Sequence, residues 1–89
     1  MSFTRDEISV LSLADDLKRV ANFIKNNSFK NVEIFTTEAT KWLEESRQIA
    51  NPSIQKILEK IEKTLKEEDN INKAEDLLMY STLLQNRSI

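Results

Sequence analysis

The chain has 89 residues, of which 31% are charged, and a formal net charge of −2. It is long enough for one hydrophobic core, and its charge is too small to indicate a strongly charged partner. It contains no glycine, cysteine or histidine, which excludes glycine-rich phosphate loops, thiolate zinc sites and catalytic triads with histidine. Tight turns between strands depend on glycine. We therefore expect one all-α domain over residues 1–89, an antiparallel up-down bundle of four helices, with three helices as the alternative, and no metal or cofactor.

The first predicted helix covers residues 5–26. It follows a capping box, in which the Thr4 hydroxyl and the Glu7 carboxylate each accept a hydrogen bond from the other residue's backbone N–H. Apolar residues recur after it at steps of three and four, which is typical of one buried helix face. The residues of this predicted inward face are Val10, Leu13, Leu17, Val20 and Ile24.

The second predicted helix covers residues 30–50 and follows a turn at Asn26–Ser28, since asparagine and serine favour turns. Its predicted inward face contains Val32, Phe35, Ala39, Trp42 and Ile49, with Leu43 beside it. Residues 32–40 are rich in β-branched side chains, which lower helix propensity, so a short strand over 31–35 is the alternative. We favour a helix because a lone strand would have no partner elsewhere in the chain.

The third and fourth predicted helices cover residues 52–67 and 71–86. Asn51 is expected to cap the third helix, and Pro52 suits its first position, where its missing N–H is not needed. Asn72 is expected to cap the fourth helix. The third inward face contains Ile54, Ile57, Leu58, Ile61 and Leu65, and the fourth contains Ala74, Leu77, Leu78, Ser81 and Leu84. The short connection between them predicts an antiparallel pair.

The fourth helix is apolar nearly all round, which is typical of a helix enclosed by its own fold or by another chain. Met79 and Leu83 lie opposite its inward face, and Tyr80 lies at the edge. We therefore predict an interface at Met79, Leu83 and Tyr80, extended by Leu11 and Phe23, which lie off the inward face of the first helix. The partner is expected to be a second copy, giving a homodimer, or another helical protein.

The third helix also has a lysine side at Lys56, Lys60 and Lys63, which could contact phosphates. Interleaved glutamates and the lack of arginine or aromatic residues on this helix favour a solvated face instead. Acidic neighbours such as Asp15 and Asp16 point about 100° apart on a helix, so we also interpret them as solvated.

Together these patterns predict a small non-enzymatic interaction or assembly protein that acts through an apolar helix face. The alternative is a small regulatory protein that contacts nucleic acid, or a partner associated with nucleic acid, through the lysine side. No apolar stretch is long enough to cross a bilayer, and we expect a cytoplasmic protein with no membrane partner.

Overall fold

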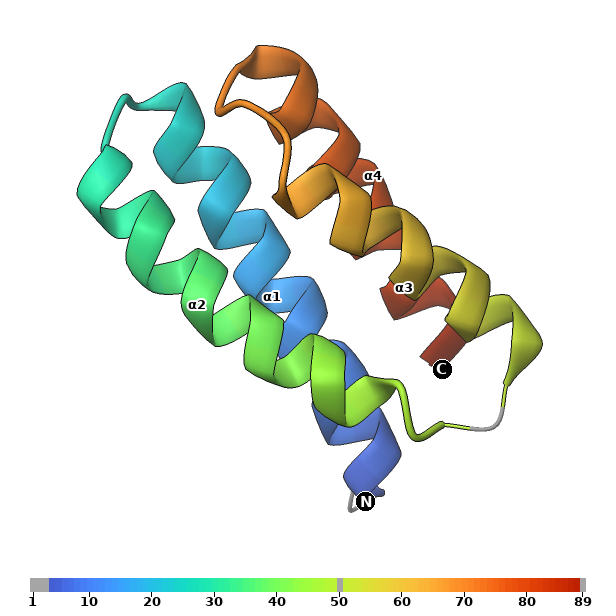
Figure 1. Ribbon diagram of the computed structural model, residues 1–89. Helices are drawn as coiled ribbons and strands as arrows, with labels where there is room; N and C mark the ends of the chain where they lie inside the picture. The colour runs from blue at the N-terminus through green and yellow to red at the C-terminus, as the bar shows by residue number, and fades with distance from the viewer. Residues whose placement is uncertain (1–3, 50, 89) are drawn as a thin grey trace.

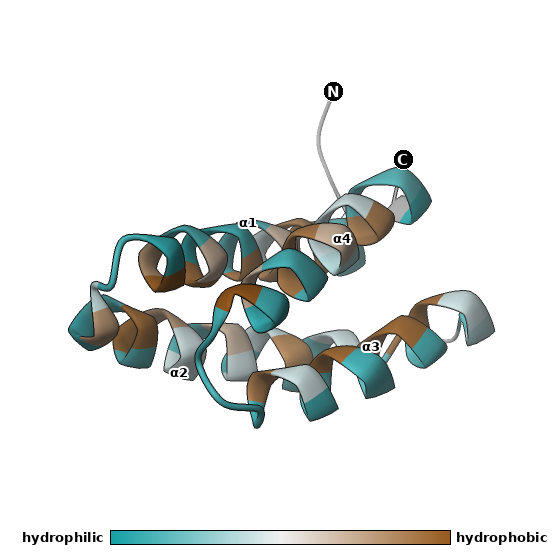
Figure 2. Ribbon diagram, turned by 90° about the horizontal axis from the view of Figure 1, so that it is seen from above, coloured by the Kyte–Doolittle hydropathy of each residue, from teal (hydrophilic) through white to brown (hydrophobic). Residues whose placement is uncertain are grey.

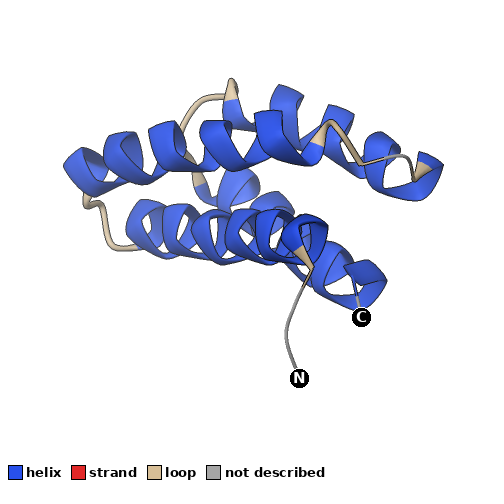
Figure 3. Ribbon diagram, turned by 90° about the horizontal axis from the view of Figure 1, so that it is seen from below, coloured by secondary structure: helices blue, strands red, loops and turns tan. Residues whose placement is uncertain are grey.

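The computed structural model describes residues 4–49 and 51–88, and these residues form helices but no strand. The helices are α1 (Arg5–Lys25), α2 (Phe29–Ser46), α3 (Pro52–Leu65) and α4 (Ile71–Ser88). Consecutive helices run in opposite directions (Figure 1) and are joined by short loops (Figure 3). The predicted all-α bundle is confirmed with four helices, and the strand considered for residues 31–35 is wrong. Within the described part of the chain, no helix is both long and apolar enough to cross a membrane.

The four helices form two layers, one of α1 with α4 and one of α2 with α3 (Figure 2). Helix α1 packs extensively against both α2 and α4, whereas α2 and α3 have the smallest contact among the helix pairs that touch. The hydroxyl of Ser81 on α4 donates to the carbonyl of Ala14 on α1 at 2.7 Å and so joins the two helices. The radius of gyration is 12.3 Å, close to the value of about 12 Å expected for a folded chain of this length.

The starts of α1 and α3 follow directly from the sequence. The Thr4–Glu7 capping box is present, and Asn51 accepts hydrogen bonds from the N–H groups of Ser53 and Ile54. Helix α4 is capped by Asn70, which accepts from the N–H of Lys73 at 3.0 Å. The prediction of Asn72 as the cap is therefore wrong.

Helix α2 ends at Ser46, four residues earlier than expected. The chain after it makes tighter bonds, with the N–H groups of Gln48 and Ile49 donating to carbonyls three residues back. The side-chain amide of Gln55 donates to the carbonyls of Arg47 and Ile49 at 3.0 and 2.6 Å. These bonds hold the turn that follows α2. Asn51, the residue before Pro52, is extended, as proline favours in the residue that precedes it.

The inward face of α2 is rotated relative to the prediction. Val32, Ala39 and Leu43 are buried, whereas Phe35 and Trp42 are half-buried. The Phe35 ring stacks on Phe23 of α1 with centroids 5.5 Å apart. Phe35 and Trp42 therefore lie on the side of α2 that faces α1, and the opposite side of α2 faces α3.

Candidate functional site

The main surface feature is an elongated hollow between α2 and α3, which we call the α2–α3 groove. It consists of two clefts of about 230 and 490 Å³ that share Thr36 and Leu65. Its lining combines a partly apolar floor with acidic walls. The lining residues are Phe29, Val32, Glu33, Thr36, Thr37, Thr40, Leu43 and Glu44 of α2, Glu62 and Leu65 of α3, Lys66, Glu67 and Asp69 of the following turn, and Lys73 of α4.

The groove exists because α2 presents small residues to α3. Phe29, Val32, Thr36, Thr40 and Leu43 recur at steps of three and four and share one helix face. In the middle of that face are two threonines, where larger apolar residues would fill the space against α3. The Thr40 hydroxyl turns back to the carbonyl of Thr36 at 2.9 Å, whereas the buried Thr36 hydroxyl has no hydrogen-bond partner in the structure.

Ion pairs cross the groove at its Leu43 end. The Arg47 guanidinium pairs with Glu44 on α2 and with Glu62 on α3, and Lys66 also pairs with Glu62. All four side chains are at least a third exposed, so each pair contributes little to stability. They link α2 to α3 at the surface without filling the space between the helices.

Lys73 closes the groove at the turn between α3 and α4. Its side chain is only 3% exposed, and its ammonium donates to the carbonyls of Leu65 and Glu67 and to the Asp69 carboxylate, at 3.0, 3.0 and 2.6 Å. All three donor positions of the ammonium are used. The positive charge also suits the C-terminal end of α3, where unpaired carbonyls gather.

The end of the groove near Phe29 is open to solvent and combines exposed apolar side chains with carboxylates. The Phe29 ring is 49% exposed, and a further cleft of about 190 Å³ continues past it to Ile71, which is 53% exposed. Glu33 on α2 and Glu67 after α3 are both exposed on the walls. Neither carboxylate has an ion pair or hydrogen bond with the described residues, so both are available to an incoming cation.

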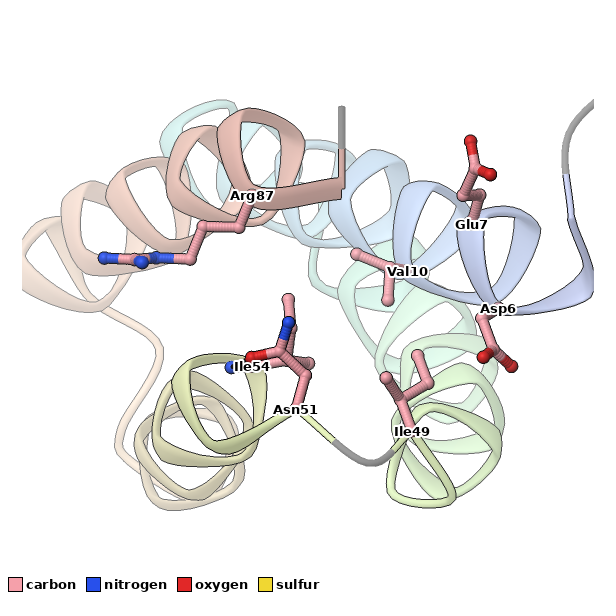
Figure 4. Close-up of a pocket in the computed structure, with 7 residues that line it drawn as sticks. All are labelled: Asp6, Glu7, Val10, Ile49, Asn51, Ile54 and Arg87. Carbon is pink, nitrogen blue, oxygen red and sulfur yellow. Dashed lines mark hydrogen bonds between the residues drawn. The ribbon is translucent and has the colours of Figure 1, made fainter.

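A second cleft, of about 170 Å³, lies at the opposite end of the bundle (Figure 4). Val10, Ile49 and Ile54 point into it, with the charged groups of Asp6 and Arg87 at its rim. Asn51 also lines this cleft, but its side chain is used to cap α3.

The predicted interface residues do not form one surface. Met79 on α4 is 48% exposed, whereas Leu83 and Tyr80 are half-buried and pack against the core. Phe23 stacks on Phe35 of α2. Leu11 is half-buried and lies one turn before Ala14, on the side of α1 that faces α4. Phe23 and Leu11 thus flank opposite sides of α1, and the apolar pattern of α4 is largely explained by packing within the chain.

The three lysines of the alternative site are all exposed on α3. Lys56, Lys60 and Lys63 are spaced by four and three residues, so they lie on one side of the helix. The α2-facing side of α3 carries Glu62 and Leu65 instead. The lysine side is therefore separate from the α2–α3 groove.

The structure overturns the interpretation of Asp16 as a solvated residue. Asp16 is fully buried on the side of α1 that faces α2. One oxygen accepts from Arg19 at 3.0 Å, and the other has no donor among the described residues. Burial, reinforced by the negative charge of Glu38, raises the pKa of the Asp16 carboxyl from 3.8 to about 6. Arg19 also lies over the Phe35 ring at 5.5 Å, so this cluster belongs to the α1–α2 contact.

The described residues contain no group of three or more carboxylate, histidine or cysteine side chains that could hold a metal ion. Comparison with known proteins gives no match, since no family model, curated protein or solved structure is significantly similar to the chain. The candidate site therefore depends on the geometry of the chain itself. The α2–α3 groove joins two clefts, whereas a single cleft of about 480 Å³ is lined, among the described residues, by Glu38, Lys41, Trp42 and Glu45 of α2 alone.

Proposed function

We propose that this chain is a non-enzymatic helical interaction protein whose partner binds in the α2–α3 groove. The observation that carries the proposal is the incomplete closure of the bundle between α2 and α3, next to the exposed Phe29 ring. Helix pairs that leave an apolar groove open commonly receive an amphipathic segment of another chain.

The packing of the other helices supports this choice of surface. The inward faces of α1 and α4 are filled by each other and by the rest of the core, as shown by the complete burial of Leu13, Leu17, Leu77 and Leu84. The groove instead has half-buried Leu65 and the small Thr36 and Thr40 along its length. A bound side chain there would gain apolar contacts without displacing the existing core.

Self-association through the outer face of α4 is a second candidate. It is supported by Met79, an exposed apolar side chain on a helix surface. Leu83 and Tyr80 contribute less than the sequence pattern suggests because both pack against the chain's own core. The contact available to a second copy on this face is therefore small, and we rank it below the groove. The nucleic-acid alternative at the lysine side of α3 and the cytoplasmic location both stay predictions from the sequence.

A photo-crosslinking experiment tests the proposed function. A photoreactive amino acid replaces Thr37, which is exposed on the groove wall, or Asp15, which is exposed on α1, and the chain is irradiated in native extract. We expect one discrete adduct from position 37 and none from position 15. Equal labelling from both positions, or no adduct from position 37, would contradict the proposal.

A further inference from the structure

We infer that the occupant of the α2–α3 groove is a basic amphipathic helix of another protein. This inference rests on the proposed function and adds the chemistry of the partner to it. Its evidence is the charge around the groove, the placement of its exposed apolar residues, and its length.

The walls of the groove carry an excess of negative charge. Five carboxylates line it, against two lysines. The ammonium of Lys73 is already used by two carbonyls and by Asp69. Lys66 and Arg47 are likewise paired with Glu62 or Glu44. Among the described residues, Glu33 and Glu67 are the lining carboxylates without a partner, one on each wall, so the groove offers unneutralised charge that a cationic side chain complements.

The unpaired carboxylates lie beside the exposed aromatic ring. Phe29, Glu33 and Glu67 line the same cleft. A planar guanidinium can stack on an aromatic face and donate hydrogen bonds to carboxylates at the same time, whereas a compact ammonium provides less stacking. The Phe29 end of the groove therefore suits an arginine of the partner, and the remainder, over Val32, Leu65 and Leu43, suits apolar side chains.

The length of the groove fits a short helix. The lining residues of α2 extend from Phe29 to Glu44, which corresponds to about 22 Å along the helix axis, or about four turns. A partner helix of about 14 residues, with apolar residues at steps of three and four, would place a side chain in the groove at every turn. The partner is thus amphipathic, with arginine on the flanks of its apolar face.

Two designed peptides test this inference on the intact chain. Both are helical, about 14 residues long, and carry the same leucine stripe, but one has arginines beside the stripe and the other has glutamates. Binding is measured by titration calorimetry, and the site is mapped by amide chemical-shift changes. We expect only the arginine peptide to bind, with the shifts concentrated over residues 29–43 and 62–73. We also expect its affinity to fall as salt rises from about 0.05 to about 0.5 M.

Matched variants test the role of the two unpaired carboxylates. We expect Glu33→Gln with Glu67→Gln to weaken binding of the arginine peptide about tenfold, since two charge pairs are lost. The control, Glu59→Gln with Glu75→Gln, removes two exposed carboxylates from outside the groove and should leave the affinity unchanged. Equal losses in the two double variants would overturn the inference.

The outcomes separate this inference from the proposed function. A crosslink at position 37 without binding of the arginine peptide would overturn the basic helix and leave the groove as the interaction surface. Equal binding of both peptides would also overturn it. Absence of both the crosslink and peptide binding would overturn the inference and the proposed function together. A purified chain that is already a dimer, with the groove amides protected, would identify a second copy as the occupant and would likewise overturn the inference.

Discussion

The buried Asp16 carboxyl gives a sharp prediction about stability. We expect Asp16→Asn to make the chain more stable at neutral pH, although it removes an ion pair with Arg19. The asparagine side chain has nearly the same shape and can still accept from Arg19 through its carbonyl oxygen. What disappears is a negative charge held in a desolvated position close to Glu38.

The size and sign of the effect follow from the pKa of Asp16. A pKa raised from 3.8 to about 6 corresponds to roughly 3 kcal/mol of unfavourable ionisation in the folded state. Between these two values the folded chain binds more protons than the unfolded chain, so the free energy of unfolding falls as pH rises. This contribution to stability is fully present below about pH 3.8 and is lost above about pH 6. The ion pair with half-exposed Arg19, which lowers the pKa, is already included in this net shift.

Urea unfolding of the wild type and of Asp16→Asn at pH 4.5 and pH 7.5 measures the effect. We expect the free energy of unfolding of the variant to exceed that of the wild type by about 1–3 kcal/mol at pH 7.5. We also expect it to differ much less between pH 4.5 and pH 7.5 than the wild-type value does. Asp15→Asn is the matched control, because Asp15 is the exposed neighbour and should change stability by less than about 0.5 kcal/mol. A less stable Asp16→Asn variant with an unaltered pH dependence would refute this reasoning.

Three further predictions follow from other residues. Lys73→Met should cost about 2–3 kcal/mol in urea unfolding, since two partly buried carbonyls and the Asp69 carboxylate lose their donor; a cost no larger than that of the exposed control Lys66→Met would contradict this role. If two copies join through α4, light scattering should give a dimer for the wild type and a monomer for Met79→Lys; equal masses would exclude that contact. If the lysine side binds nucleic acid, Lys60→Glu with Lys63→Glu should abolish salt-sensitive binding; absence of wild-type binding at low salt would dismiss it.

The parts of the fold that local chemistry determines were predictable from the sequence. The Thr4–Glu7 capping box and the Asn51 cap involve residues within a few positions of each other, and both form as expected. The inward faces of α1 and α4 were predictable as well, because apolar residues at steps of three and four share a face whatever they pack against. Val20 and Leu77, for example, are completely buried.

The sequence pattern of α2 was insufficient to predict its buried face, because this helix packs extensively against α1 and only loosely against α3. Its spacing is compatible with a face centred on Phe35 and Trp42 or on Val32 and Leu43. Only the position of α1 decides that Phe35 stacks on Phe23 while Leu43 enters the core. The threonines of the α2–α3 groove did not predict a groove, since a threonine occurs equally well on a solvent-exposed helix face.

The burial of charged residues also could not be predicted from the sequence. Lys73 and Asp16 resemble ordinary surface residues in the chain, because each has oppositely charged or polar neighbours three or four positions away. Lys73 is buried because the end of α3 turns back over it and supplies carbonyls. Likewise, the apolar pattern of α4 was compatible with enclosure by its own fold or by another chain, and Leu83 and Tyr80 pack against the core of their own chain. These contacts depend on how the helices are placed in three dimensions.

Hydroxyl-radical footprinting of the wild-type chain tests the central claim most directly, because two comparable reporters lie on the competing surfaces. Phe29 at the α2–α3 groove is 49% exposed and Met79 on α4 is 48% exposed. Each side chain's oxidation in native extract is compared with its own oxidation in buffer. The account predicts that the extract protects Phe29 and leaves Met79 unchanged. Protection of Met79 with unchanged Phe29 would contradict it and place the contact on α4.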